Sequence, residues 1–240
     1  MAPEIKTLRI ALIGYGRMGK QIHRLSEGTP FEVVQTISSE SEPLSEQVDV
    51  CIDYSVPSAV LGNVKKAAAA GVHLVIGTTG WYSEIDQVEQ IVKAADIGAV
   101  WANNFSIGAQ LYLKLLDQAA ALFSKYPGYD VSGMEIHHQE KLDAPSGTAR
   151  LMMEKLLSHY PGKRPCYDLG NRKKEPEEIH FPCLRTGSVP GTHQIRFDST
   201  VDTITLTHEA RNREGFALGS LEAAEKIAQK KGFFRLEELL

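Results

Sequence analysis

The sequence predicts an α/β protein, in which an N-terminal doubly wound parallel sheet is followed by a smaller α+β domain with a mixed sheet. Over the first hundred residues, short apolar segments alternate with helical segments, which is typical of parallel βαβ units. After about residue 104 this alternation stops, and two alternating segments, residues 192–197 and 203–208, follow each other across a short turn. Successive strands of this kind indicate a mixed or antiparallel sheet.

In the first domain, the strands are expected at residues 8–13, 31–37, 48–54, 74–76 and 99–101, and the helices at residues 17–27, 59–70 and from Ser83 onward. The alanine-rich segment 59–70 has a high helix propensity, and Gly71 after it is typical of a helix C-terminus. Ser83 with Asp86 three positions later fits a capping box.

In the second domain, helices are expected at residues 107–123 and 148–157, and an extended segment at 131–138. Residues 158–178 are rich in Pro, Gly, Lys and Glu and are expected to form an exposed loop. The predicted domains are therefore residues 1–104, with a nucleotide-type fold, and residues 105–210. The C-terminal segment 211–240, with a helix at 216–230, is expected to pack back on the first domain.

Composition excludes several classes of protein. The 240 residues are 42% hydrophobic and 23% charged with a net charge of −4, so there is no strong positive field for nucleic acid or an anionic membrane. No apolar stretch is long enough to cross a bilayer, and the first seven residues do not resemble a secretory signal. The three cysteines have neither metal-site nor redox spacing, which favours a soluble protein of a reducing compartment.

A glycine turn follows the first expected strand and opens a helix. Its sequence, Gly14-Tyr15-Gly16-Arg17-Met18-Gly19, fits the dinucleotide-binding pattern G-x-G-x-x-G. In that pattern the first glycine permits the turn, the second lets a pyrophosphate approach the backbone, and the third lets the helix pack closely. The free amides at the helix start would bind the phosphates, with Arg17 adding a charge. A Rossmann-like domain is therefore expected.

The position that selects between NAD and NADP is less informative. About 20 residues after the turn, an acidic residue usually binds the ribose hydroxyls. Here Ser38 and Ser39 stand at that point, with Glu40 and Glu42 beyond them and no arginine for a 2′-phosphate. The hydroxyl of Ser38 could serve either cofactor, so NADH and NADPH both remain open.

Residues 135–149 gather several chemically active side chains. In an extended chain, His137 and His138 point to opposite faces. Pro145 prevents a continuous helix, so Lys141 lies in a loop that leads to a helix start at Gly147 and Thr148. This arrangement predicts a pocket for an anionic substrate with a proton donor beside it. A metal site is not expected, because adjacent histidines diverge and no third ligand has the required spacing.

The same segment resembles the dihydrodipicolinate reductase family, whose pattern E-x-H-H-x-x-K-x-D-A-P-S-G-T-A is present unbroken at residues 135–149. The resemblance continues through the glycine turn, Asp-Tyr-Ser-Val-Pro at 53–57, Gly-Thr-Thr-Gly at 77–80, Asn-Phe-Ser-Ile-Gly at 104–108, Arg-Thr-Gly at 185–187 and Gly-Thr-His at 191–193. It implies NAD(P)H-dependent reduction of 4-hydroxy-tetrahydrodipicolinate in the diaminopimelate route to lysine, by a cytoplasmic homotetramer. In this family, domain 1–104 would bind the dinucleotide, and domain 105–210 would bind the substrate and form the tetramer through its sheet.

The resemblance also implies roles for individual residues. His137 is the general acid/base, assisted by Lys141, and the substrate carboxylates contact His138, Gly147 and Thr148. The nicotinamide side of the cofactor is lined by Gly77, Thr78, Thr79, Ala102, Asn103, Asn104 and Phe105. The family's acidic–basic pair after the second strand is absent here, and the segment between the second and third strands is short.

The expected chemistry begins with loss of water from the substrate, which gives a conjugated cyclic imine. A hydride then passes from the reduced nicotinamide to the ring, and the charged form of His137 protonates the resulting enamine. Two alternatives remain. A semialdehyde dehydrogenase would need a cysteine nucleophile, which the stretch 104–106 lacks. A dinucleotide-sensing module without turnover would not need a proton donor beside an anion pocket.

Overall fold

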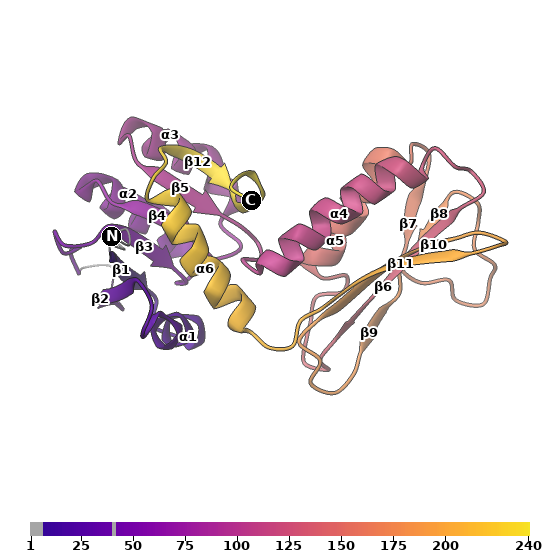
Figure 1. Cartoon of the computed structure of the whole chain (residues 1–240), viewed down its shortest axis with the longest axis horizontal. Coiled ribbons are helices and arrows are strands. Elements are labelled where there is room, and N and C mark those ends of the chain that lie inside the picture. Colours follow the sequence, from indigo (N-terminus) through magenta and orange to yellow (C-terminus); the bar gives the residue numbers. More distant parts are fainter. Residues whose placement is uncertain (1–6, 40–41) are drawn as a thin grey trace, which may run out of the picture. The chain divides into compact units, whose positions relative to one another are not determined.

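The protein divides into two compact units (Figure 1). The structure is a computed structural model, and it describes residues 7–39 and 42–240. Unit 1 contains the chain up to Ile107 together with Glu214–Leu240, and unit 2 contains Gly108–Arg213. The boundaries expected after residues 104 and 210 each lie three residues earlier than those of the two units.

Unit 1 is built on a six-stranded parallel sheet with the order β12-β5-β4-β3-β1-β2. Its strands are β1 (Leu8–Ile13), β2 (Phe31–Ile37), β3 (Val50–Asp53), β4 (His73–Ile76), β5 (Gly98–Trp101) and β12 (Gly232–Arg235). Strand β12 was not predicted, because a short strand directly after a helix shows no alternation of its own. The C-terminal helix expected at residues 216–230 ends at Ile227, and β12 follows it as the edge strand beside β5, before a last 3₁₀ turn.

Helices cover both faces of this sheet, and alternate residues of β1 show why. Ile10 and Leu12 pack with helices α1 and α6, whereas Ala11 and Ile13 pack with α2 and α3. The helices are α1 (Arg17–Ser26), α2 (Val60–Ala70), α3 (Ile85–Ala94) and α6 (Glu214–Ile227), with 3₁₀ turns η1 (Pro57–Ala59), η2 (Tyr82–Glu84) and η3 (Leu236–Glu238). The capping box expected at Ser83 is wrong: α3 begins after η2, and its N-cap Glu84 makes no side-chain cap.

Unit 2 contains a mixed four-stranded sheet with the order β11-β10-β6-β9. Its strands are β6 (Asp130–His137), β9 (Cys183–Arg185), β10 (Thr192–Asp198) and β11 (Thr203–Glu209), and β6 runs antiparallel to β10 but parallel to β9. Helices α4 (Ile107–Phe123) and α5 (Gly147–His159) pack on one face (Figure 1). Gly133 is needed in β6, because a Cβ there would lie 2.5 Å from the Ile195 side chain.

The segment expected to be an exposed loop, residues 158–178, is partly ordered into strands. Strand β7 (Arg164–Cys166) pairs in parallel with β8 (Glu178–His180). The Glu178 side chain is buried and binds Arg164 and Arg172. This polar segment therefore contains a buried carboxylate that is bound by two exposed arginines. Among the described residues, none of the helices is long and apolar enough to cross a membrane.

Candidate active site

The glycine turn after β1 is shaped by close backbone contacts. Gly14 has φ of 87°, and a Cβ on it would lie 2.4 Å from the Tyr54 carbonyl oxygen. A Cβ on Gly19 would lie 2.4 Å from the Gly14 carbonyl oxygen, so helix α1 packs directly on the turn. Gly16 faces open space instead, since nothing lies within 4 Å of its would-be Cβ. The first and third glycines therefore make the turn, and the second leaves room for a ligand.

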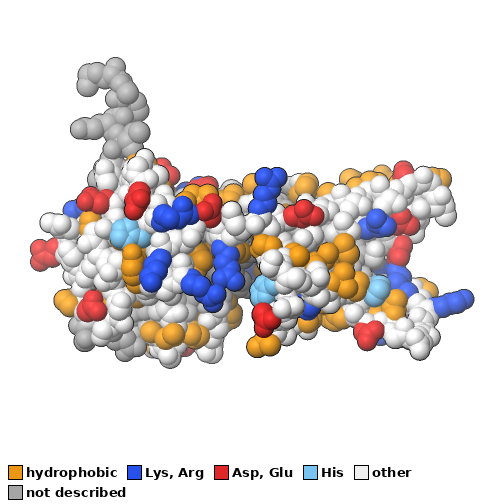
Figure 2. Space-filling view, turned by 90° about the horizontal axis from the view of Figure 1, so that it is seen from below, with side chains coloured by type: hydrophobic (Ala, Val, Ile, Leu, Met, Phe, Trp, Pro, Cys, Tyr) orange, Lys and Arg blue, Asp and Glu red, His pale blue; other side chains and the backbone are white. Residues whose placement is uncertain are grey.

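The other residues of this turn surround the start of α1. The Tyr15 hydroxyl lies 2.8 Å from Nδ1 of His23, and Met18 packs against the core on this face of the sheet. The N-cap of α1, Gly16, has no side-chain cap, so the first amides of the helix keep their capacity to bind an anion. Helix α1 also carries exposed cations, Arg17 among them, and Lys and Arg side chains gather on the surface of unit 1 seen in Figure 2.

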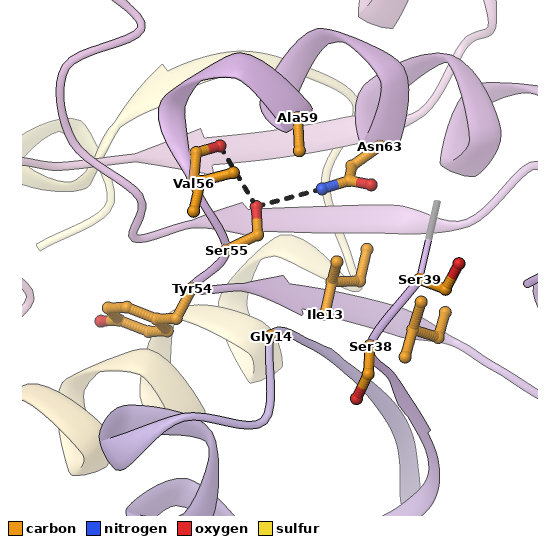
Figure 3. A pocket seen from close by; sticks show the side chains of 10 residues that line it. Ile13, Gly14, Ser38, Ser39, Tyr54, Ser55, Val56, Ala59 and Asn63 are labelled. Atoms are coloured by element: carbon orange, nitrogen blue, oxygen red, sulfur yellow. Dashed lines mark hydrogen bonds between the residues drawn. The ribbon is translucent and has the colours of Figure 1, made fainter. Parts of the chain in front are cut away.

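A cavity of about 370 Å³ lies at the carboxyl ends of β1, β2 and β3 (Figure 3). This is where the strand order reverses, because β1 leads to β2 on one side and lies beside β3 on the other. Ligands of doubly wound sheets bind at such positions. The residues lining it are Ile13, Gly14, Ile37, Ser38, Ser39, Tyr54, Ser55, Val56, Ala59 and Asn63. Ser38, predicted to contact the cofactor, is thus placed beside the glycine turn.

The carboxylate of Glu42 lies near Ser38, although Glu42 follows Ser38 by four residues in the sequence. Oε1 of Glu42 accepts hydrogen bonds from the backbone amides of Ser39 at 3.1 Å and Ser38 at 3.4 Å. The sequence shows Glu42 but gives no sign that the chain brings it back to the end of β2. A carboxylate therefore stands beside the wall of this cavity.

The residue that holds the neighbouring turns together is Asp53, which is fully buried at the end of β3. Its Oδ1 accepts hydrogen bonds from the amide of Ser55 and the hydroxyl of Thr78, and its Oδ2 from the amide of Asn63. The Thr78 hydroxyl therefore binds Asp53 inside the protein and does not face solvent. No role was predicted for Asp53 or Asn63, although an aspartate inside an apolar strand is a visible signal in the sequence.

The remaining residues predicted along the nicotinamide lie on two connections of unit 1. On the connection after β4, a Cβ on Gly77 would lie 2.2 Å from the Tyr54 ring. Thr79, on the same connection, is exposed. On the connection after β5, Ala102 and Phe105 are buried in the core, Asn103 is exposed, and Oδ1 of Asn104 accepts the amide of Ser106 at 2.8 Å.

A second polar centre lies in unit 2, around the carboxylate of Glu135. Glu135 is completely buried on β6, directly opposite His193 of β10, and His137 two residues later is opposite Arg185 of β9. Both carboxylate oxygens accept the Ser146 amide, at 3.1 and 3.2 Å, and Oε1 also accepts Nη2 of Arg185 at 3.0 Å. Burial raises the pKa of Glu135, but the interactions with His193, Ser146 and Arg185 outweigh burial and hold that pKa well below its usual range.

The two histidine rings lie against the other oxygen. Nδ1 of His137 is 3.5 Å from Oε2 of Glu135, Nε2 of His193 is 3.7 Å from it, and the rings meet edge to face. Burial is the main reason why the pKa of His137 is lowered to about 4, an effect that the charge of Glu135 opposes. His137 is therefore neutral at pH 7 in the ligand-free protein. The prediction that the charged form of His137 delivers the proton concerns the substrate complex, and it stays a prediction.

Lys141 and the start of α5 complete this centre. Nζ of Lys141 donates to Oδ1 of Asp143 at 2.6 Å, and Arg185 donates to the backbone carbonyls of both residues. The Ser146 hydroxyl caps the amide of Ala149 at 3.1 Å. The predicted substrate contacts are placed nearby in sequence: His138 directly after β6, partly buried, with exposed Gly147 and partly buried Thr148 in the first turn of α5.

The side chains of Glu135, His137 and His193 lie close enough, within 4.8 Å, to hold a cation in principle. The carboxylate, however, already binds the Arg185 guanidinium and the Ser146 amide. Positive charge beside the carboxylate opposes cation binding, so the chemistry of this donor set suits proton transfer better. Glu135 and Arg185 were not predicted as members of the site, although both lie within the recognised motifs.

Both halves of the chain match known protein families. Residues 8–105 match the N-terminal part of dihydrodipicolinate reductase, and residues 108–240 match its C-terminal part. The chain belongs to the dihydrodipicolinate reductase family. The resemblance found in the motifs is therefore confirmed, and so is the prediction of an oxidoreductase.

Relatives in this family are similar over almost the whole chain. The chain is 35% identical to the 4-hydroxy-tetrahydrodipicolinate reductase of Christiangramia forsetii, over 97% of this chain and 98% of the relative. It is 34% identical to that of Caldanaerobacter subterraneus, over 94% of each. A dipicolinate-bound dihydrodipicolinate reductase from Paenisporosarcina sp. TG-14 has a similar structure, with a TM-score of 0.79, 26% identity, and coverage of 98% of this chain and all of that one. The predicted fold class is confirmed.

Proposed function

We propose that this chain reduces 4-hydroxy-tetrahydrodipicolinate to tetrahydrodipicolinate in the diaminopimelate route to lysine, with NADH or NADPH as reductant. The observation that carries the proposal is the centre in unit 2, where a buried histidine lies between a fixed carboxylate and the Lys141 loop. Family membership supports the same reaction. A sensor without turnover would have no use for a proton donor at an anion site.

The turn and cavity of unit 1 fit a dinucleotide. Gly16 leaves room beside uncapped helix amides, and the cavity at the switch of strand order can hold a nucleoside. When bound, the reduced nicotinamide supplies the hydride. The chain's part is to hold it: Gly14 and Gly19 shape the turn, while Asp53 fixes the connection that carries Gly77 and Thr78.

Unit 2 would hold the dicarboxylate and supply the proton. Lys141 can exchange its bond to Asp143 for one to a substrate carboxylate. The amides at the start of α5, at Gly147 and Thr148, together with His138, can hold carboxylate oxygens. Two added negative charges raise the pKa of His137, so that it takes up a proton from solvent and can deliver it to the reduced ring.

The oligomeric state and the cellular location are proposed here from the family resemblance. The open face of the unit 2 sheet carries Met134 and Ile136 of β6 and the exposed Leu184 of β9. We propose that this face joins copies of the chain into a homotetramer, and that the enzyme acts in the cytoplasm on a small-molecule substrate.

The test is oxidation of NADH and of NADPH, followed in parallel, with the substrate generated in situ from pyruvate and aspartate semialdehyde by the preceding synthase. Rapid loss of the reduced-nicotinamide absorbance is expected with the wild-type protein, and at least a hundredfold slower loss with His137→Gln. No loss with either cofactor, from folded protein shown to bind them, would refute the reductase and support the sensor.

A further inference from the structure

One ring nitrogen of the proton donor has no hydrogen-bond partner in its present position. Nδ1 of His137 is buried and makes no hydrogen bond, yet Oε2 of Glu135 lies only 3.5 Å away. Buried polar atoms are normally paired, and an unpaired one needs an explanation. Catalytic hydrogen bonds are often long before the ligand arrives and shorten in the complex. The contact from Nδ1 to Glu135 is of this kind.

The carboxylate is built to stay in place while the histidine changes its charge. Its two oxygens have different partners: Oε1 accepts the Arg185 guanidinium at 3.0 Å, whereas Oε2 faces both histidine rings. The Ser146 amide, at the N-cap of α5, binds both oxygens. A fully buried carboxylate is costly unless it is satisfied in this way. Glu135 therefore presents one fixed, ionised oxygen to His137.

We propose that Glu135 is the positioning residue of the proton donor: it holds the proton of His137 on Nδ1 and stabilises the imidazolium that forms when a dianionic substrate binds. The proposal rests on the proposed function. Nε2, which lies beside Gly191, is then the nitrogen that exchanges protons. Solvent gives Nε2 a proton, the proton passes to the ring carbon after hydride transfer, and His137 returns to its neutral form while Glu135 remains ionised throughout.

The charges around His137 show why such a partner is needed. Lys141 from the loop, Arg185 from β9 and His193 from β10 all disfavour a positive charge on the ring, and burial does so most of all. His208 of β11 is the register partner of His193 on the neighbouring strand, and Cys183 of β9 interacts with Glu135. Glu135 is the group in contact with Nδ1 that favours the charged form. Without Glu135, a bound dianion would be the only group beside the ring that favours its charged form.

The test combines Glu135→Gln, which keeps the shape but removes the charge, with Glu140→Gln as a matched control on an exposed glutamate of the same segment. Histidine labelled with ¹⁵N reports the tautomer and charge of His137 by NMR, without turnover. In wild type we expect the proton on Nδ1 in the free protein, and a charged ring at pH 7 when dipicolinate is bound. Glu135→Gln should leave the ring neutral with dipicolinate, while Glu140→Gln behaves as wild type.

Kinetics separates positioning from a merely structural role. Glu135→Gln should lower kcat at least tenfold with less than a threefold change in KM, and move the alkaline limb of the kcat–pH profile to lower pH. Glu135→Asp should restore part of both. A wild-type His137 with its proton on Nε2 would overturn the proposal, as would an unchanged pH profile in Glu135→Gln. The wild-type tautomer decides the question even if the variant does not fold, and absence of turnover alongside the expected tautomer would refute only the proposed function.

Discussion

Arg185 should be among the most costly residues of unit 2 to remove, although it lies on a strand of three residues. Its guanidinium joins the buried carboxylate of Glu135 to the carbonyls of Lys141 and Asp143, at distances of 3.0, 3.3 and 2.6 Å. Arg185→Met keeps most of the side chain's apolar bulk but leaves the buried charge without its cation. Removing one partner of a buried pair typically costs about 3–5 kcal/mol. Because the Arg185 side chain is 19% exposed, we expect about 3 kcal/mol in the stability of unit 2.

A double-mutant cycle isolates the pair. If the cost comes from the unpaired carboxylate, adding Glu135→Gln to Arg185→Met should recover about 1.5–3 kcal/mol. Arg150→Met, on an exposed arginine of α5, is the control and should change stability by about 0.5 kcal/mol or less.

The assay must report on unit 2 itself, because two units need not unfold together. Both tryptophans, Trp81 and Trp101, lie in unit 1, so tryptophan fluorescence would follow the wrong unit. Hydrogen exchange measured by mass spectrometry on peptides of β6 and of loop 139–146 gives the local free energy of opening. A loss below about 1 kcal/mol in Arg185→Met, or a loss that Glu135→Gln does not reduce, would refute the reasoning.

Three further predictions follow from single contacts. Gly14→Ala forces a Cβ to within 2.4 Å of the Tyr54 carbonyl at φ of 87°, so cofactor affinity measured by calorimetry should fall at least tenfold; an unchanged affinity would contradict the assigned turn. Glu42→Gln removes a negative charge beside the cavity, and the ratio of NADPH to NADH affinity should rise about tenfold, whereas exposed Glu32→Gln should leave it unchanged. Burial lowers the pKa of His137 to about 4, so as the pH falls from 6.5 this histidine takes up a proton more readily in the unfolded chain than in the folded one. Hydrogen exchange of β6 should therefore show that stability is lost between pH 6.5 and 4. The loss should be smaller in His137→Gln.

Much of the fold could be predicted because local patterns carried it. Strands β1 and β2 and helix α4 have the expected bounds, since each is a segment whose apolar spacing matches one kind of element. Two of the strands that were not predicted have pairing partners far away in sequence. Strands β9 and β12 have three and four residues and exist only because β6 and β5 offer free edges.

The candidate site divides in the same way. His137, Lys141 and the glycine turn could be found because their residue types occur at spacings that a specific chemistry needs. Glu135, Arg185 and Glu42 could not be assigned roles, because each acts through a contact that the chain makes only when folded. Fifty residues separate Arg185 from the carboxylate it binds.

The sequence alone thus determined the fold class, the dinucleotide turn and an anion site with a proton donor, because hydrophobic periodicity and motif spacing are local properties of the chain. The type of reaction followed from the resemblance of its motifs to a known family. The tertiary structure decided which groups share a buried volume, and with it the charge state of the proton donor. His137 is neutral in the free protein because burial, together with Lys141 of the loop and Arg185 of β9, outweighs the one carboxylate beside it. That balance depends on distances in space, which spacing along the chain does not contain.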